Sequence, residues 1–421
     1  MRTAIIGGGA AGFFLALNLK EMMPGMQVCI LERSQRVLAK VAVSGGGRCN
    51  CTNTFRRVSD VAAVYPRGHR LMKRLLKVFS QDDAYRWFEG HGVPLVVQED
   101  DDCVFPEAQD SQAVIGCFLS LAHRYGVEIR RGCKVLSLDD VAGFDYVAVT
   151  TGGSPSGEGL RWLADLGHEI ERPVPSLFSL RVDDTALNCL QGLIVPRAVV
   201  HIAGTKLRAE GPLLLTHWGM SGPAILRLSS YAARHLADCN FQVPLSVNWT
   251  GMTDQQVQEV LYETALSQPR KLLTTFNGFG LPGRLWALLL DRALASKAGQ
   301  RWMDIGKKDI NRLVNVLCND SCPTAGRAPF RDEFVTCGGI SLKAVNASTL
   351  ESRHVPGLYF AGEVLDIDGV TGGFNFQAAW TTAYVVAQGI CKAAAARACK
   401  TQYTCYSSLL RDKVSWRSDS T

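Results

Sequence analysis

The sequence predicts an α/β fold: a Rossmann-like main domain, interrupted by an inserted domain that is first β-rich and then helical. Three observations lead to this prediction. A buried strand, a glycine turn and an apolar helix open the chain at 3–19, and a second glycine turn precedes an apolar helix at 371–390. Between them, residues 178–250 carry short β-like runs divided by Gly and Pro, and residues 254–325 carry helical periodicity.

The opening turn has the spacing of a dinucleotide site. "GGGAAG" at 7–12 reads G-x-G-x-x-G, whose glycines provide a tight turn, close approach of a pyrophosphate and packing of helix on strand. The pyrophosphate would lie at the positive end of the helix dipole. The strand "VCILE" then ends at Glu32, where a carboxylate can accept the ribose hydroxyls of an adenosine. The contacts expected here are Gly7, Gly9, Ala10, Ala11, Gly12, Glu32 and Arg33.

The far end of the chain selects FAD among the dinucleotides. "VPGLYFAGEVLD" (355–366) and "TGGFNFQAAW" (371–380) supply a second glycine turn and helix start, which FAD needs under its isoalloxazine ring. A helix dipole there would stabilise an anionic reduced flavin. "FDYVAVTTGG" (144–153) and "GVEIRRGCKVLSL" (126–138) predict two further strands, the second beside adenine. The contacts expected from these segments are Lys134, Val135, Thr151, Gly152, Gly153, Gly362, Glu363, Asp366, Gly372, Gly373, Phe374, Asn375 and Gln377.

The stretch "SGGGRCNCTN" (44–53) is expected to pass across the cofactor. Consecutive glycines would let the main chain lie against the pyrophosphate and the ring edge, although a turn that only needs positive φ also favours glycine. The polar residues that follow would face the flavin. The contacts expected from this loop and the helix before it are Lys40, Ser44, Gly45, Gly46, Arg48, Cys49 and Asn50.

Three residues are candidates for catalysis. Cys49, beside the flavin, could donate a proton, form a redox pair or only fill space, and its neighbour Arg48 would favour the thiolate form. His217 in "LLLTHWGMSGP" is a rival acid or substrate ligand, although a lone histidine is usually structural. Cys337 in "FVTCGGI" lies where the insert rejoins the main domain.

Charge and composition narrow the class of protein. The net charge is +6, and seven basic side chains lie between 51 and 80 against Asp60 alone: Arg56, Arg57, Arg67, Arg70, Lys73, Arg74 and Lys77. They suggest a polyanionic partner, or else a solvated face balanced by "EDDD" at 99–102. No apolar run is long enough to span a membrane. The 14 cysteines are scattered and Cys49/Cys51 have poor metal spacing, so we expect no metal site and a reducing, cytoplasmic location.

Several long motifs resemble the BaiN/RdsA family of NAD(P)/FAD-dependent oxidoreductases. They are "SGGGRCNCTN", "TTGGSPSGEG", "LLLTHWGMSGPAILRLSS" and "GGISLKAVNASTLESRHVPGLYFAGEVLDIDGVTGGFNFQAAW", in the family's order and over nearly the whole chain. The loop 152–159 is shorter than is usual in the family, which leaves open how it closes over cofactor or substrate. The resemblance implies a two-dinucleotide-binding-domain flavoprotein with an insert. We expect a FAD domain at 1–183 and 332–397, an insert at 184–331 (β-rich 184–252, helical 253–331) and a frayed tail at 398–421.

The resemblance implies a choice among activities. Members reduce a uridine in ribosomal RNA to dihydrouridine, reduce conjugated steroid enones, or oxidise amines. The first two add hydride to an electron-poor C=C bond and protonate the neighbouring carbon. NADPH or NADH would bind transiently as reductant, since no separate motif for it is present. The basic stretch at 51–80 and a second one at 251–330, with ten basic residues against seven acidic, favour rRNA as the partner. A flavin-bound protein that only binds RNA or senses redox state is the non-enzymatic alternative. The oligomeric state is not predicted.

Overall fold

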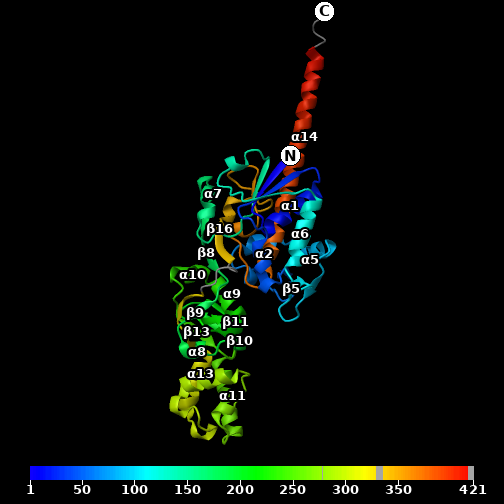
Figure 1. Cartoon of the computed structure of the whole chain (residues 1–421). Helices are drawn as coiled ribbons and strands as arrows, with labels where there is room; N and C mark the ends of the chain where they lie inside the picture. The colour runs from blue at the N-terminus through cyan, green and yellow to red at the C-terminus, as the bar shows by residue number, and fades with distance from the viewer. Residues whose placement is uncertain (277, 329–334, 416–421) are drawn as a thin grey trace, which may run out of the picture. The chain divides into compact units, whose positions relative to one another are not determined.

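A computed structural model describes residues 1–276, 278–328 and 335–415, with side chains described as far as residue 399. The chain forms two compact units: Met1–Pro173 together with Gly338–Thr421, and Val174–Cys337 (Figure 1). The second unit is inserted into the first, as the order of sequence patterns predicts. Among the described residues, none of the helices combines the length and the apolar composition that crossing a lipid bilayer requires.

A parallel sheet of five strands, in the order β17-β7-β1-β2-β6, forms the framework of the first unit. Strands β2 and β7 lie on opposite sides of β1, so the order of the strands reverses at β1. In open parallel sheets of this kind, ligands bind beyond the carboxyl ends of the strands at the point of reversal. The residues that follow these strands are therefore candidates for a ligand-binding site. The strands are β1 (Arg2–Ile6), β2 (Gln27–Glu32), β6 (Glu128–Arg131), β7 (Tyr146–Val149) and β17 (Leu358–Phe360).

An aromatic core joins the helices of this unit. Helix α1 (Ala10–Met22) packs against α14 (Phe374–Ser415), although the two come from opposite ends of the sequence. The ring of Trp380 lies 5.1 Å from that of Phe14 and 5.5 and 5.7 Å from those of Phe88 and Phe118. All four side chains are completely buried. Burying each contributes about 1.5–3 kcal/mol, so this cluster holds the start of α14 firmly against α1.

Shorter elements fill the remainder of the first unit. A small antiparallel sheet in the order β3-β5-β4 follows the glycine loop in sequence. Its strands are β3 (Thr52–Asn53), β4 (Leu95–Val97) and β5 (Cys103–Pro106). The other helices are α2 (Ala39–Val43), η1 (Ser44–Gly47), α3 (Val61–Val64), α4 (His69–Leu75), α5 (Gln81–Gly90), α6 (Gln112–Arg124), η2 (Asp139–Val141), η3 (Glu158–Leu160), α7 (Arg161–Asp165), η7 (Leu342–Ala344) and η8 (Gly362–Val364).

The second unit has its own sheet and core. Seven strands in the order β14-β13-β10-β11-β12-β9-β15 form an antiparallel sheet, and large buried side chains such as Trp249 and Trp302 fill the core. The strands are β9 (Leu180–Val182), β10 (Ile194–Ile202), β11 (Arg208–Thr216), β12 (Gly219–Ser221), β13 (Leu245–Asn248), β14 (Asp320–Ser321) and β15 (Thr324–Arg327). The helices are α8 (Thr185–Asn188), α9 (Pro223–Tyr231), α10 (Ala233–Asp238), α11 (Asp254–Ser267), η4 (Leu273–Thr275), α12 (Gly283–Leu294), η5 (Ala295–Lys297), η6 (Trp302–Asp304) and α13 (Lys307–Asn319).

The boundaries differ in places from those expected. The predicted first segment ends at 183, but β9 pairs with β12 and β15 and so belongs to the second unit. The segment expected to be helical, 253–331, ends in strands β14 and β15, while residues 329–331 lie outside the described residues. Two strands, β8 (Ile170–Ser176) and β16 (Val335–Ile340), pair with each other where the chain leaves and re-enters the first unit.

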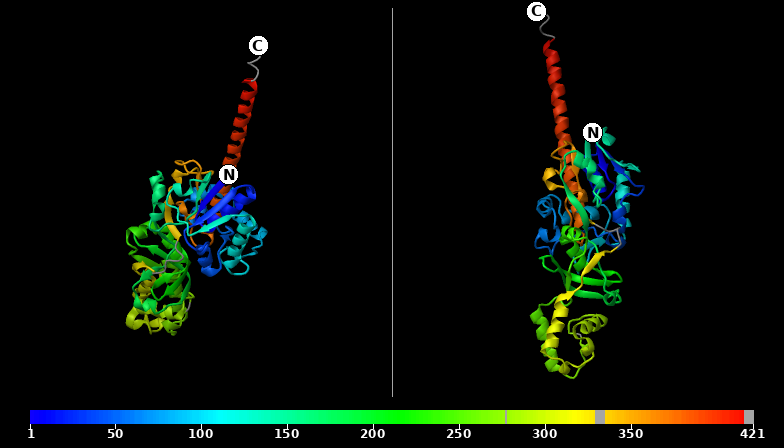
Figure 2. Two further views of the ribbon diagram at one scale, coloured as in Figure 1. Left: turned by 45° about the horizontal axis from the view of Figure 1, so that its top comes forward. Right: turned by 90° about the vertical axis from the view of Figure 1, so that its left-hand side faces the viewer.

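The C-terminal tail is more regular than expected. The sequence predicts fraying from 398, whereas α14 continues to Ser415 and extends beyond the other elements of the first unit (Figures 1 and 2). The run "CKAAAARACK" (391–400) is rich in alanine, the strongest helix former, which favours helix past residue 398. Residues 416–421 of the predicted tail lie outside the described residues.

A buried ion pair connects α4's entry loop to the segment before α14. Arg67 Nε donates to Asp368 Oδ1 at 2.6 Å, and Arg67 Nη2 donates to Asp368 Oδ2. Only 11% of the Arg67 side chain and none of that of Asp368 is exposed. The expectation that Arg67 belongs to an open basic surface is therefore wrong, because its guanidinium already donates to both oxygens of the Asp368 carboxylate.

We expect Asp368→Asn to lower the free energy of unfolding by about 3 kcal/mol, because the change leaves the Arg67 charge buried beside a neutral group. Urea unfolding of the purified variant measures this. Arg86→Ala, which breaks the exposed pair with Asp83, is the control and should change stability little. Equal unfolding midpoints for Asp368→Asn and the wild type would contradict the structural role of the pair.

Candidate functional site

The glycines of the first turn differ in what surrounds them. A Cβ on Gly7, whose φ is +113°, would lie 2.6 Å from the Thr150 carbonyl oxygen, and one on Gly12 would lie 2.0 Å from the Gly7 carbonyl oxygen. A Cβ on Gly9 would have no described heavy atom within 4 Å. Gly7 and Gly12 are thus required by the packing of turn, strand and helix, whereas Gly9 faces open space. This is the arrangement expected where a pyrophosphate approaches the backbone.

The N-terminus of α1 opens at the same place. Among the described side chains, none caps the helix at Gly9, and its first turn holds no acidic residue. The first amides of a helix carry partial positive charge and lack intrahelical acceptors, so they favour an anion. Ala10 is partly exposed here, while Ala11 is buried against η8, where a Cβ on Gly362 would lie 2.9 Å from that of Ala11.

Glu32 closes the adenosine side of the site. Its carboxylate accepts hydrogen bonds from the backbone N–H groups of Gly8 and Ser34, both at 2.8 Å, which fix its orientation at the end of β2. Each oxygen keeps a lone pair that could accept a ribose hydroxyl. The backbone of Cys133 donates to the Glu32 carbonyl at 2.9 Å, so Lys134 and Val135 follow directly beside it. The Arg33 side chain is exposed.

A second group of predicted residues gathers after β7 and β17. Lys40 Nζ forms an ion pair with Glu363 Oε2 at 3.0 Å. A Cβ on Gly152 would lie 3.6 Å from the same carboxylate oxygen, so α2, the loop after β7 and η8 converge. Thr151 is exposed, and Gly153 and Asp366 are partly exposed. These segments are far apart in sequence and meet at the carboxyl edge of the sheet.

The triple-glycine loop adopts left-handed backbone throughout. The φ values of Gly45, Gly46 and Gly47 are +57°, +67° and +85°. A Cβ on Gly45 would lie 3.0 Å from the Asn50 nitrogen, but Gly46 and Gly47 have no described heavy atom within 4 Å of a Cβ. The loop therefore needs glycine both for its turn and, at Gly46 and Gly47, along an open face. Arg48 stacks on Phe105, with its guanidinium carbon 4.3 Å from the ring centroid, and Ser44 Oγ donates to the Val41 carbonyl at 2.8 Å.

The start of α14 is fastened to residues 50–53. A Cβ on Gly373 would lie 2.3 Å from the Thr52 carbonyl oxygen, so only glycine permits this approach. With its amide oriented to satisfy both groups, Asn50 accepts from the Gly373 N–H at 3.1 Å and donates to the Thr52 carbonyl at 2.8 Å. Gln377 is completely buried and accepts from Thr52 Oγ1 at 2.6 Å.

Other predicted contacts near this helix have structural partners. Asn375 holds the preceding loop, accepting from the Gly369 N–H at 2.8 Å and donating to the Gly369 carbonyl at 2.9 Å. The Phe374 ring packs edge-on against Phe55 with centroids 5.1 Å apart. Gly372 has a φ of +126°.

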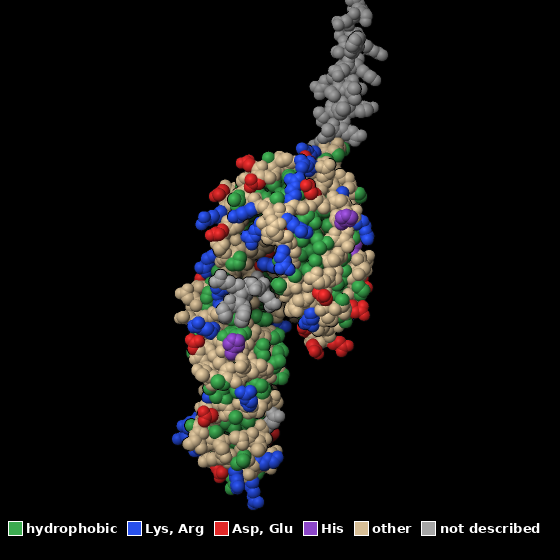
Figure 3. Space-filling model, viewed as in Figure 1, with side chains coloured by type: hydrophobic (Ala, Val, Ile, Leu, Met, Phe, Trp, Pro, Cys, Tyr) green, Lys and Arg blue, Asp and Glu red, His purple; other side chains and the backbone are tan. Residues whose placement is uncertain are grey.

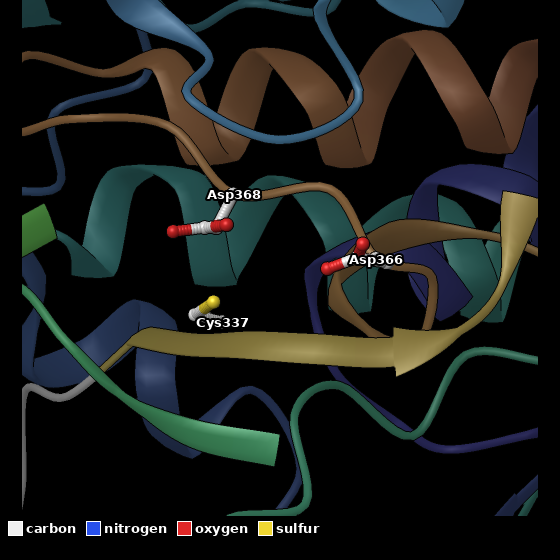
Figure 4. A group of neighbouring side chains, drawn as sticks. All are labelled: Cys337, Asp366 and Asp368. Carbon is white, nitrogen blue, oxygen red and sulfur yellow. The ribbon is translucent and has the colours of Figure 1, made fainter. Parts of the chain in front are cut away.

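The three catalytic candidates lie in different settings. Cys49 is completely buried, with its thiol 3.9 Å from that of Cys51. The hydrogen bond to Cys49, together with burial, raises the pKa of the Cys51 thiol well above its usual value. His217 is exposed on the turn between β11 and β12 and contacts the Trp218 ring. Cys337 is completely buried, and Figure 4 shows its thiol near the carboxylates of Asp366 and Asp368, with atoms of the three side chains within 4.8 Å of one another.

Sequence reasoning missed several residues that shape the site. Thr150 Oγ1 donates to the Gly7 carbonyl at 2.9 Å, Trp380 Nε1 donates to the Cys51 carbonyl at 2.8 Å, and Tyr65 Oη donates to the Phe374 carbonyl at 2.8 Å. Burial raises the pKa of Tyr65 well above its usual value, so it remains a donor. The position of Thr150 directly before "TGG" could have indicated its role. The partners of Trp380 and Tyr65 are about 300 residues away in the sequence, so no local sequence pattern could indicate these contacts.

These features fit a flavin dinucleotide. A Cβ on Gly9, Gly46 or Gly47 would enter open space, and an uncapped helix end suits a pyrophosphate. The Glu32 carboxylate is fixed where an adenosine ribose is expected. The start of the second helix, α14, lies against Asn50 and Thr52 at the end of the glycine loop. The residues that could hold the cofactor are therefore those of the first turn, Glu32, the glycine loop and the segments around Gly152 and Gly362.

We expect Gly9→Ala to fold normally but to purify with little FAD, because its φ of −94° suits any residue and its Cβ would enter the open face. Gly12→Ala should instead lower stability, since its Cβ would overlap backbone. Thermal unfolding and the flavin absorbance per protein measure both effects. The reverse order of stability for the two variants would contradict the assigned packing.

Gly46→Val should reduce flavin occupancy by more than tenfold, because a branched side chain would project into the space expected for the cofactor. Gly126→Val is a matched control: its φ is also +67°, its Cβ would also meet no described atom within 4 Å, and it precedes β6 at the opposite edge of the sheet. Both carry the same backbone strain of about 1–2 kcal/mol. Similar occupancy in the two variants would show that Gly46 serves the turn alone.

Comparisons with known proteins identify several similar chains. The chain is 27% identical to proteins named ribosomal RNA dihydrouridine synthase from Haemophilus influenzae and Escherichia coli, over 92% of this chain and 97% of each relative. It is 26% identical to a 3-dehydro-bile acid delta(4,6)-reductase of Clostridium scindens, over 91% of this chain and 97% of that one. A 3-ketosteroid delta1-dehydrogenase structure from Sterolibacterium denitrificans aligns with a TM-score of 0.45 at 12% identity, over 93% and 99% of the two chains. The family model described as HI0933-like protein Rossmann domain matches residues 1–389, so this chain belongs to the HI0933-like family.

Proposed function

We propose that this chain is an FAD-dependent oxidoreductase that reduces the C5=C6 bond of a uridine in ribosomal RNA to dihydrouridine, with NADPH or NADH as reductant. The observation that carries the proposal is the match, over nearly the full length of both chains, to two proteins named ribosomal RNA dihydrouridine synthase. The cradle of glycines and helix ends supports the coarser part, flavin-dependent redox chemistry. We also propose that the protein acts in the cytoplasm, where ribosomal RNA is found.

FAD, when bound, supplies a two-electron carrier between a nicotinamide and the substrate. The residues of the chain would position it. Amides at the start of α1 would bind the pyrophosphate, and Glu32 would bind ribose hydroxyls. The start of α14, held by Asn50 and Thr52, would direct a helix dipole toward the negative charge that the ring carries after reduction. Cys49, His217 and Cys337 stay candidates for the proton donor to C5, and the two thiols among them are completely buried.

Exposed cations support RNA as the substrate. Of the seven basic residues between 51 and 80, six have exposed side chains: Arg56, Arg57, Arg70, Lys73, Arg74 and Lys77. Arg57 bends toward the acidic turn 99–102, where it pairs with Asp102 at 3.3 Å, and Arg74 donates to Ser348 Oγ. Arg70, Lys73 and Lys77 remain on the exposed part of α4 and the residues after it. A neutral small-molecule substrate has no use for such a group, whereas phosphates do.

A second candidate is the reduction of a conjugated C=C bond in a small molecule. It is favoured by the nearly equal identity, 26%, to the bile-acid reductase. Both reactions deliver hydride and a proton across an electron-poor double bond, so the flavin site alone does not distinguish them. The distinction lies in what binds outside the flavin.

We expect ribosomal RNA from cells that lack this protein to lose one dihydrouridine, seen by mass spectrometry as a fragment lighter by two hydrogen atoms, and to regain it when the wild-type gene is restored. Complementation with Gly9→Ala, which should fold without holding FAD, is the control and should not restore it. Purified protein that oxidises NADPH with a steroid enone but leaves uridine in rRNA unchanged would favour the second candidate.

A further inference from the structure

The segment 266–308 of the second unit carries an unusual charge. It holds eight Lys and Arg residues against two Asp and no Glu, an excess of six that equals the net charge of +6 of the whole chain. The first unit's basic stretch plays no part in this excess. Two of the eight cations pair with carboxylates outside the segment, Arg292 with Asp184 and Asp320 and Lys297 with Asp309. The cations that have no such partner still create a positive potential that attracts polyanions.

Two short stretches of this segment form one small platform. Leu272 and Arg301 are antiparallel bridge partners. The Leu273 N–H donates to the Gln300 carbonyl at 3.0 Å, and the Trp302 N–H donates to the Lys271 carbonyl at 3.1 Å. The Met303 N–H donates to the Pro269 carbonyl at 2.9 Å, which extends the pairing by one step. Residues 269–273 and 300–303 therefore lie side by side.

Burial divides the side chains of the platform into an inner and an outer face. Leu273 and Trp302 point inward and are 0% and 2% exposed, with the Trp302 ring packed edge-on against Phe276 at 5.4 Å. Their neighbours Leu272 and Met303 are 43% and 61% exposed. Leu272 and Met303 therefore belong to the outer, solvent-exposed face of the platform. The aromatic residues beneath hold that face rigid.

The outer face combines cations with apolar side chains. Arg270, Lys271 and Arg301 are exposed, and within the described residues no ion pair links any of them to a carboxylate. Leu266, at the end of α11, is 82% exposed and lies just before the platform in sequence. Figure 3 shows Lys and Arg side chains at the helical end of this unit. We call Arg270, Lys271, Leu272, Arg301 and Met303 the basic platform.

We propose that the basic platform is an RNA-binding surface that engages phosphates with its three cations and ribose or base faces with its two apolar side chains. The inference rests on the proposed function and adds a second contact with the same class of substrate. Phosphates are the groups that unpaired Arg and Lys side chains bind most readily, and Arg binds them through two donors at once.

The test measures RNA affinity as a function of salt. Replacing Arg270, Lys271 and Arg301 with alanine should weaken binding of deproteinised ribosomal RNA and flatten the slope of log K against log salt by about two to three. The control replaces three other exposed cations, Arg161, Lys206 and Arg208, and removes the same charge. Its slope should stay close to that of the wild type. Leu272→Ser with Met303→Ser should lower affinity without changing the slope.

The outcomes separate this inference from the proposed function. If the platform variant and its control have equal slopes, the platform is a solvated surface and the inference is wrong, whatever the wild type does to uridine. If the slope flattens as expected but the wild type forms no dihydrouridine in rRNA, the RNA surface stands and the proposed reaction fails. NADPH-driven flavin reduction should be unchanged in all three variants, and circular dichroism should show them folded.

Discussion

Close backbone approach at two glycines is the constraint on which the flavin site depends. Gly12 lets α1 lie against the turn after β1, and Gly373 lets α14 begin against the backbone of Thr52. A single methyl group at either position would overlap main-chain atoms. The two helices then pack on each other through Phe14 and Trp380, so the aromatic core sets their mutual position. The site is thus a consequence of core packing, with both helix starts fixed before any ligand binds.

The loop 44–53 is held from several sides. Asn50 accepts from the amide of Gly373 just before α14, Arg48 lies on Phe105, and the Trp380 indole donates to the Cys51 carbonyl. The Gly47 carbonyl accepts from the Ser111 N–H at 2.8 Å, while a Cβ on Gly46 or Gly47 would meet no described heavy atom within 4 Å. Charge is also distributed unevenly over the site. The helix N-termini and Lys40 supply positive charge where the phosphates are expected, and the carboxylates of Glu32 and Glu363 lie at the margins of that region. Binding energy for a dinucleotide would come mainly from preformed backbone groups.

The sequence predicted the fold class because its signals are local. "GGGAAG" and Glu32 stand at fixed spacing, and the insert changes from β-like to helical patterns where α11 begins. Residues whose partners are distant could not be assigned in this way. Arg67 looked like an open cation, yet Asp368, about 300 residues later, buries it. The end of the first segment was misplaced because β9 is three residues long and finds its partners only within the seven-stranded sheet.

The pairing of β8 with β16 has an evolutionary meaning. Because the outgoing and returning strands form one ribbon, the second unit is attached through a single junction, and its loss or replacement would leave the five-stranded sheet with ends that can still be joined. The second unit can therefore change in sequence or length without altering the strand order of the five-stranded sheet.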